Sequence, residues 1–109
     1  MRYWMGYGWG ESLRDGLMST DLTATLEERG KRYGRFIDRA QIVQKLKLVI
    51  LQALINGNKH LAPDQHEALD MICCKIGRII NGDPDHADSW IDIAGYAQLV
   101  ADRLNGVER

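Results

Sequence analysis

The chain of 109 residues has few cysteines and few prolines, and the scarcity of cysteine limits the kinds of site that it can form. Its two cysteines are adjacent, at Cys73 and Cys74, and no second pair lies elsewhere in the sequence. A disulfide framework or a four-cysteine zinc site needs more cysteines at suitable spacing, so the sequence supports neither. The two thiols are expected to be structural and to lie in a reducing cytosol.

An excess of charge of one sign is also absent. Lysine and arginine number 14 and aspartate and glutamate number 15, which gives a formal net charge of −1 with histidine neutral. Proteins that wrap DNA or lie on a membrane surface through bulk charge are strongly basic, so neither class fits this balance. No bulk nucleic-acid binding is therefore expected.

Long apolar runs are missing as well. The longest, residues 48–55, is interrupted by Gln52 and is much shorter than the roughly 20 residues that span a bilayer. The first residues combine aromatics with glycines and lack the basic start and continuous apolar core of a secretory signal. These absences predict a cytoplasmic protein with no membrane segment.

Helical periodicity dominates what is present, and no sustained strand alternation is seen. The pattern predicts an all-α domain with helices at about residues 20–31, 36–55, 63–81 and 88–104, the first of them stopping near Gly30. Pro63 suits the first position of the third helix, and Asp85 or Asp88 is expected to cap the fourth. Residues 18–109 are thus expected to form one helical bundle, preceded by an aromatic, glycine-rich extension at residues 1–17.

Apolar side chains at helical spacing define the faces that we expect to be buried. On the third and fourth helices these stripes are Leu69, Ile72, Ile76, Ile79 and Ile80, and Trp90, Ile93, Ala94, Ala97, Val100 and Leu104. The second helix is apolar around nearly its whole circumference over residues 48–55. Because a small bundle cannot cover such a helix on every side, we expect a homo-oligomer, either a dimer or a tetramer.

Acidic residues at helical spacing mark the candidate site. Glu67 and Asp70 lie three residues apart on the third helix, and Asp88 and Asp92 lie four apart on the fourth. Mg²⁺ prefers carboxylate oxygens, so two acidic pairs on one helical hairpin predict a magnesium site. The alternative is a solvated polar face with Asp88 as a helix cap, because charges at such positions are usual on surface helices.

Other polar side chains suit the remaining parts of a nucleotide. Lys75 and Arg78 lie on the third helix near the acids, where cations would offset the charge of a polyphosphate. Tyr96 lies nearer the acidic side than the apolar stripe, and its hydroxyl could reach a phosphate or a ribose. The three histidines show no metal-ligand spacing, and no P-loop pattern is present.

The segment 75–97 carries the pattern K-I-x-R-I-x-x-G-D-P-x-x-x-D-S-W-x-D-I-A-G-Y-A. Together with Tyr33 and Gly34 upstream, it resembles a small phage and prophage domain of unknown function that is related to the nucleotide-modification-associated domain. A more distant similarity is to the MazG-like all-α nucleoside triphosphate pyrophosphohydrolases, which are oligomers in which two helices supply acids for Mg²⁺. Glu67 and Asp70 match the spacing of the first acidic pair of that group, whereas three residues, not two, separate the acids of the second pair.

These residues and resemblances imply a phage-derived protein that binds a nucleotide and, with Mg²⁺, hydrolyses a nucleoside triphosphate to the monophosphate and pyrophosphate. Its expected metal ligands and catalytic residues are Glu67, Asp70, Asp88 and Asp92, and its expected substrate contacts are Lys75, Arg78, Tyr33 and Tyr96. The expected location is then the cytosol of the host cell. The alternatives are a non-enzymatic accessory or anti-defence protein that binds a host protein or sequesters a nucleotide, and a structural domain without a ligand.

Overall fold

The computed structural model describes residues 21–109, and all regular structure in this part of the chain is α-helical. Its elements are α2 (Asp21–Tyr33), α3 (Phe36–Asn56), α4 (Pro63–Asn81) and α5 (Ala87–Leu104). The prediction of an all-α bundle is therefore confirmed, while the extension expected at residues 1–17 lies outside the described residues. None of the helices over residues 21–109 is both long and apolar enough to cross a membrane.

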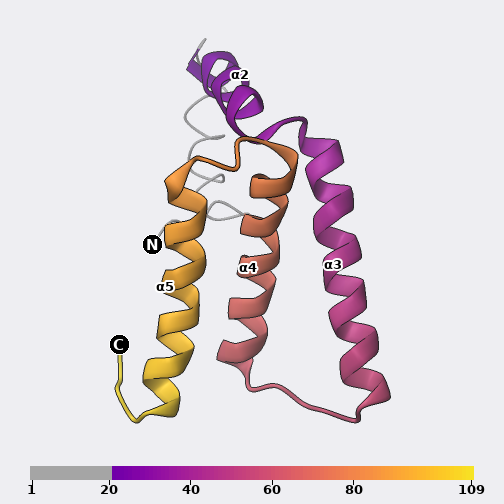
Figure 1. The fold of residues 1–109 in the computed structure, drawn as a ribbon, viewed down its shortest axis with the longest axis vertical. Helices are drawn as coiled ribbons and strands as arrows, with labels where there is room; N and C mark the ends of the chain where they lie inside the picture. Colours follow the sequence, from indigo (N-terminus) through magenta and orange to yellow (C-terminus); the bar gives the residue numbers. More distant parts are fainter. Residues whose placement is uncertain (1–20) are drawn as a thin grey trace.

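The three long helices lie side by side, with α4 in the middle (Figure 1). Helix α3 packs on one side of α4 and α5 packs on the other, and α3 and α5 do not pack on each other. Helix α2 lies across the end of this layer where α3 begins and α4 ends. A layer of this kind buries side chains mainly along its two seams, one between α3 and α4 and the other between α4 and α5.

Local signals explain most of the helix ends. Pro63 is the first residue of α4, as expected, because its fixed φ suits a helix start. Helix α2 continues through Gly30, the expected stop, for three more residues. The predicted caps of α5 are wrong: His86 occupies the N-cap position with no side-chain cap, and Asp85 lies outside the helix. The Asp88 carboxylate lies inside the first turn, 3.5 Å from the Nε2 atom of His86.

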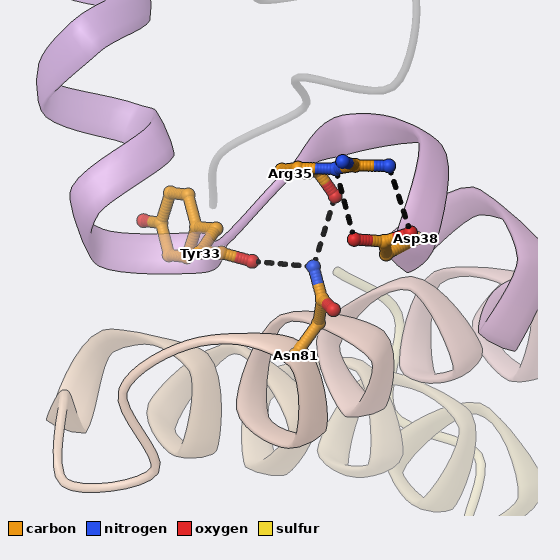
Figure 2. A network of polar contacts seen from close by, with 4 residues as sticks. All are labelled: Tyr33, Arg35, Asp38 and Asn81. Atoms are coloured by element: carbon orange, nitrogen blue, oxygen red, sulfur yellow. Dashed lines mark hydrogen bonds and ion pairs between the residues drawn. The ribbon is translucent and has the colours of Figure 1, made fainter.

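Asn81, the last residue of α4, holds the short connection between α2 and α3 in place (Figure 2). Its side-chain Nδ2 donates hydrogen bonds to the backbone oxygens of Tyr33 at 3.0 Å and Arg35 at 2.9 Å. Gly34 lies between them with a φ of 76°, and a Cβ at this position would collide with the backbone oxygen of Asn81. These contacts hold Tyr33 against the end of α4.

Two small apolar clusters line the seams. The residues of the two clusters and their partly buried neighbours are Val43, Cys73, Cys74, Leu46 and Ile50 between α3 and α4, and Ala68, Met71, Tyr96, Ile72 and Val100 between α4 and α5. Both cysteines are buried and free, and burial raises the pKa of each thiol. A raised pKa keeps a thiol protonated and unreactive, which agrees with a structural role.

The predicted buried stripes of α4 and α5 are wrong for many of their members. The exposed ones are Leu69, Ile80, Trp90, Ala94, Ala97 and Leu104, and the half-buried ones are Ile72, Ile76, Ile93 and Val100. Only Ile79 is buried as expected. The physical reason is that each helix in the layer buries only the side that faces a neighbour, and on α4 that side carries Lys75 and Arg78.

Candidate functional site

A buried ion pair joins α4 to α5. The Nζ atom of Lys75 lies 3.0 Å from Oδ2 of Asp92, and the side chains of Lys75 and Asp92 are 0% and 11% exposed. Removing two charges from water is costly, and only close contact between them recovers much of that cost. The solvated-face alternative is therefore wrong for Asp92, whose carboxylate contacts the buried lysine.

A tyrosine and two arginines form a second buried group, the Tyr33–Arg39–Arg78 cluster. Tyr33 is the last residue of α2, Arg39 lies near the start of α3, and Arg78 lies near the end of α4. The Cζ atom of Arg78 is 4.6 Å from the centre of the Tyr33 ring, and that of Arg39 is 5.9 Å from it. All three residues are at most 5% exposed. An aromatic face attracts such cations, and desolvation strengthens the attraction.

Burial lowers the pKa of both arginines in this cluster. The pKa of Arg78 falls to about 9, chiefly through desolvation, with Arg39 and Arg29 lowering it further and Tyr33 and Asp92 opposing the change. Desolvation is also the largest cause of the lowered pKa of Arg39. Because a pKa of about 9 still lies above neutral pH, Arg78 remains a cation there. The cluster thus concentrates positive charge where α2, α3 and α4 meet.

The two tyrosines expected to contact substrate lie on either side of the Lys75–Asp92 pair. The Tyr33 ring packs edge-on against the ring of His86, with their centres 6.1 Å apart. Tyr96 is one turn beyond Asp92 on α5 and is buried in the α4–α5 seam. The interior of the layer therefore contains, in order, the Tyr33–Arg39–Arg78 cluster, the Lys75–Asp92 pair and Tyr96.

The four predicted metal ligands have different surroundings. Glu67 is exposed, Asp70 lies 3.8 Å from Nε2 of His66, Asp88 lies near His86, and Asp92 pairs with Lys75. The first acidic pair therefore lies on the outer part of α4, and only Asp92 points into the interior.

Two cross-helix ion pairs fix the antiparallel register of α4 and α5, namely Asp64 with Arg103 and Lys75 with Asp92. In this register Asp88 lies level with Ile79, so at about 1.5 Å per residue it is about 18 Å from Glu67 along the helices. Over residues 21–109, no three side chains of the His, Cys, Asp and Glu types gather in a way that could hold a metal ion. The four acids therefore do not fit one Mg²⁺ ion within a single chain.

The sequence reasoning missed two residues of this region, Arg39 and Asn81. Arg39 follows Phe36 by three residues and precedes Val43 by four, so it is in helical register with apolar side chains of α3, and a charge at such a position is a signal that could have found it. Asn81 has no comparable signal, because its hydrogen-bond partner Tyr33 is 48 residues away in the chain. Only the folded arrangement shows its role.

Comparison with known proteins gives the family. No curated protein matches the chain, and no solved structure matches it. A family model described as a domain of unknown function (DUF6378) matches residues 17–104, a range that includes the ion pair and the whole Tyr33–Arg39–Arg78 cluster. The chain therefore belongs to the DUF6378 family.

Proposed function

We propose that this protein binds a nucleotide, with Lys75 and Arg78 holding its phosphate groups and Tyr33 and Tyr96 contacting its base or sugar. One observation carries the proposal: α4 places two cations in the interior while a large apolar side chain of the same helix, Ile80, is 67% exposed. Cations in a place of limited water attract phosphate more strongly than cations on the surface do.

Stability alone does not explain these buried cations. Replacing a buried ion pair by apolar residues of similar volume is often neutral or stabilising, so the pair of Lys75 and Asp92 is weak evidence of a stabilising device. Strongly perturbed ionisable groups are common at functional sites, and the pKa of Arg78 is lowered to about 9 by burial. A binding role accounts for both features.

We further propose hydrolysis of a nucleoside triphosphate to the monophosphate and pyrophosphate, with Mg²⁺ as the cofactor. Glu67, Asp70, Asp88 and Asp92 remain the proposed ligands, but they do not fit one ion within a single chain. In the single chain the Lys75 ammonium offsets the charge of Asp92. The proposal therefore places hydrolysis in an oligomer, where acids of neighbouring chains come together.

A homo-oligomer is part of the same proposal. The large apolar side chains exposed on the three long helices include Leu48, Val49, Leu51, Ile55, Ile80, Trp90, Ile91 and Leu104. Helix α3 packs on α4 along one side and touches α2 near its start, so among residues 21–109 much of its apolar circumference has no neighbour. Apolar surface of this extent is typical of protein interfaces. A second copy of this chain is the proposed partner.

Titration calorimetry with nucleoside triphosphates, with and without Mg²⁺, tests the proposal. Wild-type protein is expected to bind, and Arg78→Met is expected to bind about tenfold more weakly or worse, because a charge-assisted hydrogen bond to phosphate is lost. Arg103→Met is the matched control, since it removes the same charge at the far end of α5.

Pyrophosphate release then separates the possible roles of the bound nucleotide. Release that depends on Mg²⁺ supports the pyrophosphohydrolase, whereas binding without release supports a phage-derived protein that sequesters nucleotides. If the wild type binds no nucleoside triphosphate, the proposal is wrong. The protein would then be better described as an accessory or anti-defence protein that binds a host protein.

A further inference from the structure

Arg39, which the sequence did not indicate as a site residue, is a buried arginine close to two aromatic rings. Its guanidinium is near two aromatic rings, with Cζ 5.1 Å from the centre of Phe36 and 5.9 Å from the centre of Tyr33. Arg78 approaches the same Tyr33 ring from α4, with Cζ at 4.6 Å. Two guanidinium groups from different helices are therefore gathered at one tyrosine.

The absence of a side chain at Gly77 leaves room for the stem of Arg39. Gly77 lies beneath its stem, and a Cβ at that position would be 3.2 Å from Cγ of Arg39 and 2.5 Å from Cγ2 of Val43. Asn81 fixes the backbone of Tyr33 through its 3.0 Å hydrogen bond. Both α3 and the end of α2 are thus positioned so that the two arginines and the tyrosine meet.

Bringing two like charges together in a buried place is unfavourable. Desolvation is the main cause of the lowered pKa of Arg78, and the charges of Arg39 and Arg29 lower it further; desolvation lowers the pKa of Arg39 as well. An anion that contacts both guanidinium groups would lower this cost, because it attracts both of them. The arrangement gains most from a ligand of concentrated negative charge with several acceptor oxygens.

We propose that Arg39 and Arg78 together bind a phosphoryl group beside Tyr33, so that Arg39 is a further ligand-binding residue of this protein. An arginine stacked on a ring keeps its N–H donors in the guanidinium plane, and its fork matches two oxygens of one phosphate. The cluster lies at the end of the helical layer next to Phe36, which is 65% exposed. A ligand would therefore approach from the side of the Phe36 ring.

This inference deepens the proposed function and rests on it only in taking the phosphoryl group to belong to a nucleotide. Free phosphate and pyrophosphate share the same chemistry, so they serve as probes that need neither base nor metal ion. The test is titration calorimetry of the full chain with pyrophosphate, inorganic phosphate and a nucleoside triphosphate, all without Mg²⁺ and at low salt.

Three variants accompany the wild type. Arg39→Met keeps most of the stem and removes the charge, Arg39→Lys keeps the charge and removes the fork, and Arg35→Met removes an exposed arginine four residues away. We expect pyrophosphate binding to weaken about tenfold or more in Arg39→Met, to be intermediate in Arg39→Lys and to be unchanged in Arg35→Met. Circular dichroism melts establish that each variant is folded, and if Arg39→Met unfolds, Arg39→Lys alone decides.

The outcomes separate this inference from the proposed function. If the wild type binds pyrophosphate and the Arg39 variants lose this binding, the inference holds. If, in addition, a nucleoside triphosphate binds the wild type no better than pyrophosphate does, that result counts against the nucleotide proposal alone. If the nucleoside triphosphate binds the wild type and the Arg39 variants equally, the inference is wrong while the nucleotide proposal stands. Wild-type protein that binds none of the three probes overturns both.

Discussion

The contact between Lys75 and Asp92 decides how α4 and α5 are joined at their centre. It is the most buried ion pair in the part of the chain that the structure describes, with the lysine fully buried. The other cross-helix pair, Asp64 with Arg103, lies at an exposed end of the same seam. Single residues in the interior are therefore expected to have much larger effects than their counterparts at the surface.

Asp92→Asn is expected to lower the free energy of unfolding by about 3–5 kcal/mol, because it leaves the buried Lys75 ammonium without the Asp92 charge. Urea denaturation measures this loss, and Asp85→Asn, which changes an exposed acid, is the control. A loss below about 1 kcal/mol, as is usual for a surface pair, would contradict the role given to this contact.

Replacing both partners is expected to have a smaller effect than replacing one. Lys75→Met combined with Asp92→Leu fills the same space with apolar atoms and leaves no buried charge, so most of the stability lost in Asp92→Asn should return. The double variant is also the suitable protein for nucleotide titration, since its binding can be measured in a folded chain.

Gly77→Ala is expected to destabilise the protein by about 1–3 kcal/mol through overpacking, although alanine is normally the better helix former. A Cβ at Gly77 would meet Val43 at 2.5 Å, and the stem of Arg39 as well. Gly30→Ala is the matched control, because nothing lies within 4 Å of a Cβ at that helical position. That variant should be more stable than the wild type by about 1 kcal/mol, and equal effects of the two substitutions would refute the close approach at Gly77.

At the scale of the helices, the sequence was sufficient to locate the elements and insufficient to orient them. Pro63 favours the start of a helix and the Gly82-Asp83-Pro84 segment favours its end, so both ends of α4 were predicted correctly. The faces failed because the stripe rule assumes that a chain covers its own apolar side chains. Ile80 and Trp90 are exposed here while Ile79 is buried, so the rule finds only part of the buried side of each helix.

In the candidate site, too, the sequence identified residues but not how they are arranged. The sequence named Lys75, Arg78 and Asp92, and the structure places them close together in the interior. Spacing within a helix shows which side chains share a face, but it does not show what that face meets on another helix. For this reason the separation of Glu67 from Asp88 and the contribution of Arg39 could be learned only from the fold.

The exposed end of the α4–α5 hairpin is expected to depend on pH. Arg103 donates two hydrogen bonds to Asp64, at 2.8 and 2.7 Å, and these lower the pKa of Asp64 below its ordinary 3.8. Because the pKa is lower in the folded chain than in the unfolded chain, the stabilisation is present above about pH 4 and is lost as the pH falls through the folded value. Asp64→Asn should lower the Tm at pH 7 and have no effect on the Tm at a pH below the pKa of Asp64 in the folded chain. A Tm difference that stays constant with pH would contradict this account.

At the scale of the whole molecule, the helices of residues 21–109 form a single layer, and none of them covers its two broad sides. Domains normally pack two layers around one core, and residues 21–109 supply only one such layer. Helix α3 exposes several large apolar side chains, among them Val49 and Ile55, that have no cover from the other described helices. The proposed homo-oligomer supplies a second layer from another copy of the chain.

Light scattering after size exclusion is expected to give a mass of at least twice the 12.4 kDa of one chain. Val49→Glu places a charge on an apolar residue that is 64% exposed in the single chain, and it should shift the assembly towards smaller species. Lys45→Glu, an exposed charged position on the same helix, is the control and should leave the mass unchanged. A well-folded wild-type monomer would contradict the proposal.

We expect the interior arginines of α3 and α4, and not surface cations, to contact a phosphate group. Nuclear magnetic resonance of the arginine Nε–H groups during titration with a nucleoside triphosphate tests this directly. The signals of Arg39 and Arg78 are predicted to shift with ligand concentration while that of Arg103 stays in place. Shifts confined to exposed arginines, or no shifts at all, would contradict the claim.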